Sequence, residues 1–106
     1  MGVTKMELYD VDELELAAWA KALGHPARIA IIRYLLKSKT CVNGDLTDEI
    51  GLSQPTISQH LKELKNAGFI RGTVSGTSIN YCINPEKWNL VSAAFQAFFG
   101  QFCASD

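Results

Sequence analysis

The stretch "LSQPTISQHLKELKNAGFI" (residues 52–70) decides the fold, because an apolar helical stripe in it follows a polar leading end. Ile57, Leu61 and Leu64 recur with the period of about 3.6 residues that is typical of an amphipathic helix, so one face of the segment is expected to be buried. Start and stop signals flank the stripe and predict a helix over about residues 54–67. The stripe explains one face of this helix but gives no role to the polar face opposite.

That opposite face is polar and nearly uncharged. A helix face that only meets solvent usually carries Glu/Lys pairs, whereas hydroxyl and amide side chains with a few lysines suit contacts with base edges and phosphates. We therefore interpret the face as a DNA-reading surface, with an ordinary solvent face as the alternative. Its residues, including those at the free N-terminal end of the helix, are Gln54, Pro55, Thr56, Ser58, Gln59, Lys62 and Asn66.

The residues before this helix complete a helix-turn-helix pattern. In "DLTDEIGLS" (residues 45–53), Leu46 and Ile50 are one helical turn apart, and Gly51 follows where the chain has to turn sharply. We expect Leu52 to be a buried plug ahead of the second helix. A short helix, a glycine-containing turn and a second helix are typical of this motif.

A two-stranded hairpin is predicted directly after the second helix. In "FIRGTVSGTSINYCI" (residues 69–83), apolar and polar residues alternate on both sides of Gly76, which supplies the turn. A hairpin in this position makes the motif winged, and its polar side chains can reach a phosphate backbone or a minor groove. The residues expected to hold the DNA backbone from the helix end and the wing are Lys65, Arg71, Thr73, Ser75 and Thr77.

These elements predict a mainly α fold with a small β-hairpin, a winged helix-turn-helix of about five helices and a two-stranded wing, in a single domain over residues 1–106. Their order and several stretches resemble the ArsR/SmtB-type bacterial repressors, small winged-helix dimers that release DNA when an effector binds. The resemblance implies a homodimer that binds an inverted repeat in double-stranded DNA. It covers roughly residues 15–100, and the similar stretches are "KALGHPARIAIIRYL" (21–35), "CVNGDL" (41–46), residues 52–70 and "GTVSGTSINYCI" (72–83).

Length and composition agree with one small domain in the cytoplasm. A chain of 106 residues with 47% hydrophobic content can form a modest core, and cores of this size often gain stability from oligomerisation. There is no basic-plus-apolar N-terminal signal and no apolar run near ~18 residues, so we expect neither secretion nor membrane insertion. Three cysteines without a Cys-x-x-Cys motif argue against a disulfide framework and fit a reducing compartment.

The formal net charge of −1 at first argues against a nucleic-acid partner, but the distribution of the charges along the chain matters more than their sum. Acidic residues are concentrated in residues 7–15, and all the charged residues from there to residue 39 are basic. Between Ser53 and Ser78 three basic residues stand against Glu63, which leaves a modestly positive reading surface. We therefore expect moderate, salt-sensitive DNA affinity from a dimer.

Both ends of the chain carry apolar helical patterns that predict a dimer interface. In "PEKWNLVSAAFQAFFGQFC" (residues 85–103), apolar residues recur at alternating spacings of three and four, the pattern of a heptad seam. The resemblance implies that the first and last helices form the homodimer contact, whereas the alternative is that both ends pack only on their own domain. The candidate interface residues are Leu14, Ala18 and Trp19 in a first helix over about residues 12–23, with Trp88, Val91, Phe95, Phe98 and Phe102 in the last.

The effector is harder to assign, because the thiolate pattern of the resembled family is altered. In members that sense arsenic or heavy metals, a Cys-x-Cys pair stands at the start of the helix before the recognition helix, and here that place reads Cys41-Val42-Asn43. The zinc site that other members carry on the last helix is missing. Cys41, Cys82 and Cys103 are candidate metal ligands only if they come together, and otherwise they are three separate small apolar side chains. We expect no cofactor, no zinc response and a weak or absent arsenite response, with thiol oxidation at Cys41 as the favoured switch.

A helix that Pro26 opens is predicted before the helix-turn-helix pattern. His25 stands at its start and is expected to be a structural residue, while Arg28 can pair either with a phosphate or with an acid on a neighbouring helix. His60 flanks the apolar stripe of the reading helix and is expected to pack at the core boundary rather than to bind metal. The residues of the Pro26 helix expected to face inward are Ile29, Ile32 and Leu36.

An enzyme is not expected, because the sequence lacks a nucleophile–base pair, a glycine-rich phosphate loop and an HExxH motif. The main alternative is a winged helix that serves only as a protein-interaction module without specific DNA binding, since a fold alone does not fix a function. An acidic or apolar reading face would favour that alternative. The Gln, Thr, Ser and Lys side chains of the face favour DNA instead.

Overall fold

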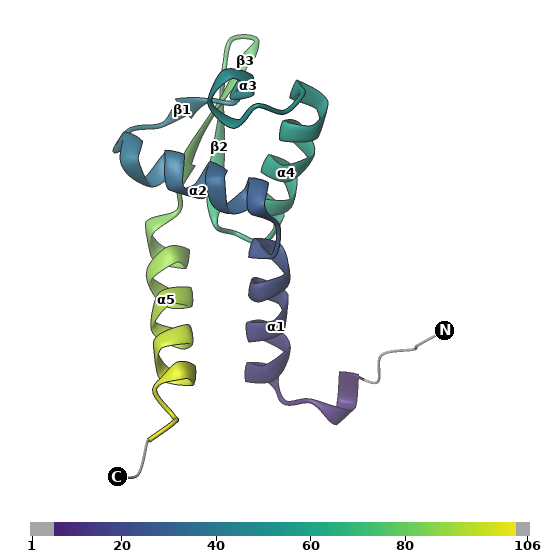
Figure 1. Cartoon of the computed structure of the whole chain (residues 1–106), viewed down its shortest axis with the longest axis vertical. Helices are drawn as coiled ribbons and strands as arrows, with labels where there is room; N and C mark the ends of the chain where they lie inside the picture. The colour runs from purple at the N-terminus through teal and green to yellow at the C-terminus, as the bar shows by residue number, and fades with distance from the viewer. Residues whose placement is uncertain (1–5, 104–106) are drawn as a thin grey trace.

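The computed structural model describes residues 6–103, and it has the winged helix-turn-helix architecture that the sequence predicts (Figure 1). Within these residues there are five α-helices and one three-stranded antiparallel sheet, and none of the helices is long and apolar enough to cross a membrane. The elements in chain order are a 3₁₀ turn at Met6–Leu8, α1 (Val11–Leu23), α2 (Pro26–Ser38), β1 (Val42–Asn43), α3 (Thr47–Ile50), α4 (Gln54–Asn66), β2 (Ile70–Ser75), β3 (Ser78–Ile83) and α5 (Pro85–Phe99).

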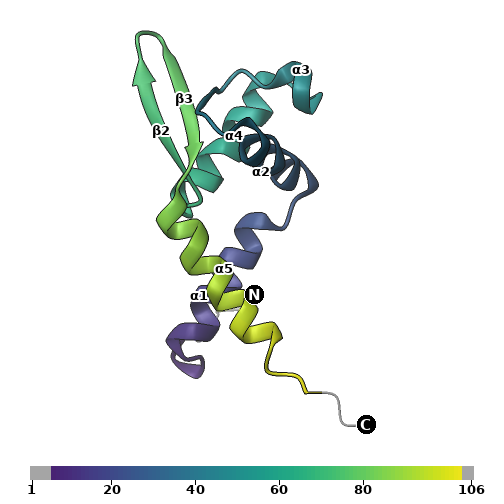
Figure 2. The same ribbon diagram turned by 90° about the vertical axis from the view of Figure 1, so that its left-hand side faces the viewer.

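The helices and the sheet form two parts of one molecule. Helices α2, α3 and α4 gather beside the sheet, while α1 and α5 lie side by side, run in opposite directions and extend from that body (Figures 1 and 2). The hairpin of β2 and β3 projects away from the helices at the other end (Figure 2). The first and last helices are therefore separated in space from the tip of the wing.

The sheet contains the predicted hairpin and one strand that the sequence did not predict. The strand order is β1-β3-β2, with Thr73 opposite Asn80 in the hairpin and Val42 opposite Tyr81 in the added pair. Gly76 has a φ of +63°, a left-handed conformation that glycine adopts without steric cost, and it turns the chain between the two long strands. Strand β1 is only two residues long, which is too short to show an alternating pattern in the sequence.

The core is built around the apolar stripe of α4, as predicted. Ile57, Leu61 and Leu64 are fully buried, together with Phe69 in the turn after α4 and Leu46 just before α3. Burying such side chains contributes roughly 1.5–3 kcal/mol each. The burial of this stripe fixes which face of α4 remains outside.

Two expectations about apolar residues are wrong. Leu52 is 37% exposed and is not a plug, because Leu46 already fills the core at this end of the motif. In α2, Ile29 and Leu36 are exposed as well. Ile32 is buried as predicted, but the apolar run of α2 offers several overlapping stripes at helical spacing, and packing against α4 and β3 buries other residues in place of Ile29 and Leu36. The residues of α2 that are buried are Ala27, Ile31, Ile32 and Leu35.

Candidate nucleic-acid interface

The solvent-facing side of α4 carries short polar side chains, as the sequence predicts. Pro55, Thr56, Ser58, Gln59 and Lys62 are all exposed, because the opposite face of the helix is committed to the core. The helix has the exposed, mostly uncharged polar surface that a major groove accepts.

Hydrogen bonds between side chains order this surface. The Ser53 and Thr56 hydroxyl oxygens are 3.0 Å apart, and the Ser53 side chain makes no hydrogen bond to the helix backbone although Ser53 is the N-cap residue. Further along, Nε2 of Gln59 donates to a carboxylate oxygen of Glu63 at 3.0 Å. These exposed contacts can be exchanged for contacts with bases at small cost.

Gln54 is used differently from what the sequence suggests. Its side chain is half-buried, and its Nε2 donates to the carbonyl oxygen of Gly44 at 3.0 Å and to Oγ of Ser58 at 3.1 Å. Its Oε1 is buried and, among the described residues, has no hydrogen-bond partner. Gln54 therefore ties the start of α4 to the loop between β1 and α3, whereas we expected it to lie free at the helix end.

The wing presents polar side chains at its exposed end. Thr73, Ser75 and Thr77 are exposed, and so are the apolar side chains of Val74 and Ile79, because the hairpin extends beyond the core on both of its faces. A hollow of about 270 Å³ separates the wing from the start of α4. Helix and wing are thus spaced as two separate contact points.

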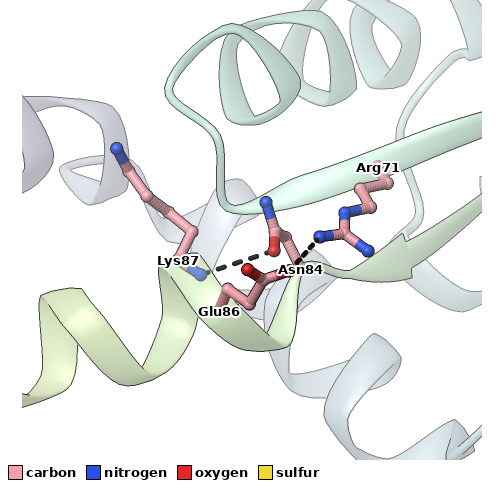
Figure 3. Close-up of polar contacts among 4 residues, drawn as sticks. All are labelled: Arg71, Asn84, Glu86 and Lys87. Carbon is pink, nitrogen blue, oxygen red and sulfur yellow. Dashed lines mark hydrogen bonds and ion pairs between the residues drawn. The ribbon is translucent and has the colours of Figure 1, made fainter.

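The basic residues differ in their surroundings. Arg71, at the start of the wing, forms an ion pair with Glu86 in the first turn of α5, with Nη2 and Oε1 2.9 Å apart (Figure 3). Lys62 and Lys65 are exposed, and among the described residues neither forms an ion pair. The Arg71 pair could not be predicted from the sequence, because fifteen positions separate its two partners.

The predicted dimer residues fall into two groups. Trp19 and Val91 are buried in the core of the chain itself, and Trp88 and Phe95 are half-buried against that core. The group that remains open to solvent consists of Leu14, which is half-buried, and of Ala18, Phe98 and Phe102. The heptad seam is also shorter than expected, because α5 ends at Phe99 and Gly100 follows as its C-cap.

An open apolar hollow lies between the two terminal helices. It has a volume of about 380 Å³, its apolar lining includes Leu16, Leu90, Ala94 and Phe98, and Asp12, Glu15 and Gln101 also line it. Phe98 is 49% exposed and Phe102 is 82% exposed. A large exposed apolar side chain such as Phe98 beside a hollow is typical of an interaction surface.

Cys41 and Cys82 form a disulfide, which corrects the expectation that the cysteines are unpaired. The pairing of Val42 with Tyr81 between β1 and β3 places Cys41 opposite Cys82, and their Cα atoms are 4.4 Å apart, within the range that a disulfide requires. Cys103 is free and exposed, and it follows the end of α5 that points away from the sheet (Figure 1). The described part of the chain therefore does not bring the three cysteines together, and it contains no cluster of three or more His, Cys, Asp or Glu residues suited to a metal ion.

The histidines have structural roles, as predicted. His25 is the N-cap of α2, and its Nδ1 accepts a hydrogen bond from the backbone N–H of Ala27 at 3.0 Å. His60 is buried at the edge of the core. Arg28, which the sequence left open between a phosphate and an acid, instead donates from Nε to Nδ1 of His60 at 3.1 Å and from Nη1 to the carbonyl oxygen of Ala22 at 3.0 Å.

Known proteins with similar sequences share this architecture. A family model described as "Bacterial regulatory protein, arsR family" matches residues 25–71. The chain is 33% identical to the biofilm growth-associated repressor of Xylella fastidiosa over 88 residues, which cover 82% of this chain and 76% of that protein. The chain belongs to the ArsR family.

Other ArsR family members differ in how much of their length is shared. The chain is 46% identical to the transcriptional repressor SmtB of Mycobacterium tuberculosis over 61 residues, which are 58% of this chain but only 44% of that protein, so less than half of SmtB is matched. The crystal structure of the transcriptional repressor BigR from Xylella fastidiosa superposes with a TM-score of 0.63 and 28% identity, covering 97% of this chain and 100% of that one. These relatives are named as regulators and not as enzymes, as the sequence led us to expect.

Proposed function

We propose that this ArsR family protein is a homodimeric, sequence-specific DNA-binding repressor of transcription. The observation that carries the proposal is the exposed polar face of α4, which lies opposite a fully buried apolar stripe and carries Thr56, Ser58 and Gln59. Membership of the ArsR family and the repressors among its relatives support the same function. Such a protein would act where the chromosome lies, in the cytoplasm.

Each part of the interface has a proposed role. Pro55, Thr56, Ser58 and Gln59 enter the major groove, where the Gln59 amide pairs with adenine or with a phosphate. Gln54, at the same end of the helix, supports them through its bond to the Gly44 carbonyl. The backbone is held by Lys62, Lys65, Arg71 and the wing residues Thr73, Ser75 and Thr77.

The dimer is proposed to form through the open surface of α1 and α5. A two-fold axis through this surface would present two copies of α4 to the same side of a duplex, with half-sites of an inverted repeat about one helical turn, ~10 bp, apart. The exposed Phe98 and the hollow beside it supply an apolar contact that a single chain leaves open. The exposed residues Leu14, Ala18 and Phe102 are proposed to lie in this contact, and the buried Trp19 and Val91 support it from beneath.

A salt-dependent titration tests this function against a protein-interaction module. The protein is titrated against labelled genomic fragments and random duplexes of equal length at several salt concentrations. A repressor selects particular fragments, and its affinity falls steeply as salt rises because counterions are released from the phosphates. Equal weak binding to every duplex would contradict the proposal and favour the protein-interaction alternative.

The release signal is proposed to be the oxidation of Cys41 and Cys82. Cys41 is exposed, and the bond to Cys82 ties the segment between α2 and β1 to the strand β3 of the wing. With glutathione disulfide as oxidant, the Cys41 thiolate forms a mixed disulfide and one glutathione leaves. The Cys82 thiolate then attacks Sγ of Cys41 and displaces the second glutathione.

This reaction can switch DNA binding only if the two redox states differ in DNA affinity. The disulfide constrains the wing relative to α2, so we propose that the dithiol form binds the operator and the disulfide form releases it. A gel-shift titration of the protein reduced by dithiothreitol and oxidised by glutathione disulfide tests this step. Equal affinities of the two forms would contradict the proposed signal and would leave the DNA-binding function itself intact.

A further inference from the structure

A polar cluster away from the reading face connects three helices. His60 is 7% exposed, and it is the one buried polar side chain among the described residues. Because its Nδ1 accepts from Arg28, and Arg28 also donates to the carbonyl oxygen of Ala22, the cluster links the middle of α4 to the start of α2 and the end of α1. It therefore fixes the position of the proposed reading helix relative to one of the two proposed dimer helices.

His25 completes this cluster from the N-terminus of α2. The centroid of its ring is 4.4 Å from that of His60, and its Nδ1 is occupied by the Ala27 backbone N–H. An imidazole whose Nδ1 accepts a hydrogen bond is neutral and carries its proton on Nε2. The hydrogen bond from Arg28 thus requires His60 to be neutral.

The surroundings of His60 offer no acid to balance a proton. The charged groups on α4 itself are Lys62, Glu63 and Lys65. Of the elements packed against α4, α2 carries His25 and Arg28, whose charges act on His60, while α1 carries Lys21 next to Ala22 and β2 carries Arg71. Arg71 is engaged by Glu86, and Glu63 accepts from Gln59. In the part of the chain that the structure describes, no carboxylate is hydrogen-bonded to the cluster. A proton on His60 would therefore stand beside a guanidinium without an opposite charge.

The electrostatics of the site agree with this geometry. Burial lowers the pKa of His60 below its ordinary value of 6.5, and the charges of His25 and Arg28 lower it further. Because the pKa is lower in the folded than in the unfolded chain, the folded state is fully stabilised above about pH 6.5 and loses that stabilisation as the pH falls below it.

We propose that Arg28 is a positioning residue for DNA reading, which holds α4 against α1 and α2 only while His60 is neutral. Protonation converts Nδ1 of His60 from acceptor to donor, breaks the bond from Arg28 and releases α4 from its fixed position. Operator affinity therefore falls in mildly acidic solution. The direction is distinctive, because a histidine that gained a proton beside a phosphate would strengthen DNA binding instead. The inference rests on the proposed reading role of α4.

A pH profile of operator affinity tests the proposal with matched variants. Between about pH 8 and about pH 5.5 the parent protein should lose about tenfold in affinity at constant ionic strength. His60→Asn keeps an acceptor near the position of Nδ1 and does not titrate, so it should lose less than about twofold. His60→Leu leaves the Arg28 donor unpaired and should bind about tenfold more weakly throughout. His25→Asn keeps a helix cap and should retain the acid loss of the parent.

Circular dichroism at each pH shows whether the chain stays folded. An equal acid loss in His60→Asn, its absence in His25→Asn, or tighter binding by the parent at low pH would overturn the proposal. A loss of affinity that coincides with global unfolding would overturn it as well, because α4 would then not be released from an otherwise intact fold.

A second measurement needs no DNA. Nitrogen NMR of the imidazole groups follows the protonation of His60 in the parent and in Arg28→Met. The pKa of His60 should lie below 6.5 in the parent and rise in the variant, which lacks both the donor and the charge. An unchanged pKa would overturn the role of Arg28 even if the protein bound no operator, so failure of this inference is distinguishable from failure of the proposed function.

Discussion

Replacing Glu86 with Gln should strengthen DNA binding, because it releases Arg71. Nη2 of Arg71 lies 2.9 Å from Oε1 of Glu86 at the base of the wing, and the Lys87 side chain extends away from this pair (Figure 3). Nζ of Lys87 lies instead over the ring of Trp19, 5.2 Å from its centroid. A phosphate that approaches Arg71 therefore competes with the Glu86 carboxylate, and the substitution removes the competitor.

The size of this effect follows from the exposure of the pair. The Arg71 and Glu86 side chains are 54% and 86% exposed, so solvent screens their attraction. Exposed pairs contribute about 0–1 kcal/mol, which corresponds to an affinity gain of up to about fivefold for each subunit. One additional phosphate contact should also steepen the dependence of log affinity on log salt by about 0.9 for each subunit. Fluorescence anisotropy of a labelled operator at several salt concentrations measures both quantities.

A control separates the local effect from the change in overall charge. Glu86→Gln removes one negative charge, so the formal net charge changes from −1 to −1 + 1 = 0. In an Arg71→Ala background the same substitution changes the charge but releases no guanidinium. The gain in affinity should therefore vanish in that background, and an equal gain in both backgrounds would refute the reasoning. The absence of any gain in the parent background would refute it too, because Arg71 would then not contact a phosphate.

The remaining predictions concern reading, assembly and release. Gln59→Ala should cost about 1–3 kcal/mol at one base step and relax the preference there, whereas Lys65→Ala should weaken binding evenly and flatten the salt slope; equal effects of both on every sequence in competition assays would contradict the proposed roles. Phe98→Asp should give a folded monomer by analytical ultracentrifugation, with weak operator binding, because that side chain is 49% exposed; a stable dimer would place the contact elsewhere. Cys82→Ser should abolish operator release by glutathione disulfide in footprinting assays. Full release of the parent by stoichiometric arsenite would instead reveal a complete metalloid site.

Several elements of this fold are encoded locally and could be predicted. The stripe of Ile57, Leu61 and Leu64 defines α4, because a helix brings residues three and four apart onto one face. The alternation around Gly76 defines the wing in the same way, since that glycine adopts the left-handed turn conformation. Local periodicity cannot choose between overlapping stripes, which is why the prediction for α2 was right for Ile32 but wrong for Ile29 and Leu36.

The candidate site was predicted less completely than the fold. Exposure of the polar face of α4 follows from burial of the opposite face, and so the sequence identified Ser58 and Gln59 as candidates. The internal use of Gln54 could not be predicted, because its partner is a backbone carbonyl ten positions earlier. Every residue has a backbone carbonyl, so the residue types do not indicate which carbonyl will accept a hydrogen bond.

The sequence by itself determined the helix-turn-helix, the wing and the polar face of α4, since each depends on residues within one or two turns or strands. The tertiary structure alone decided the bond between Cys41 and Cys82, which are 41 positions apart and meet only because β1 pairs with β3. It also decided the contact of Arg28 with His60, 32 positions apart, because only the packing of α2 on α4 brings the two together. Contacts between residues so far apart in the sequence depend on how whole helices and strands pack together, and no local pattern of residue types specifies that packing.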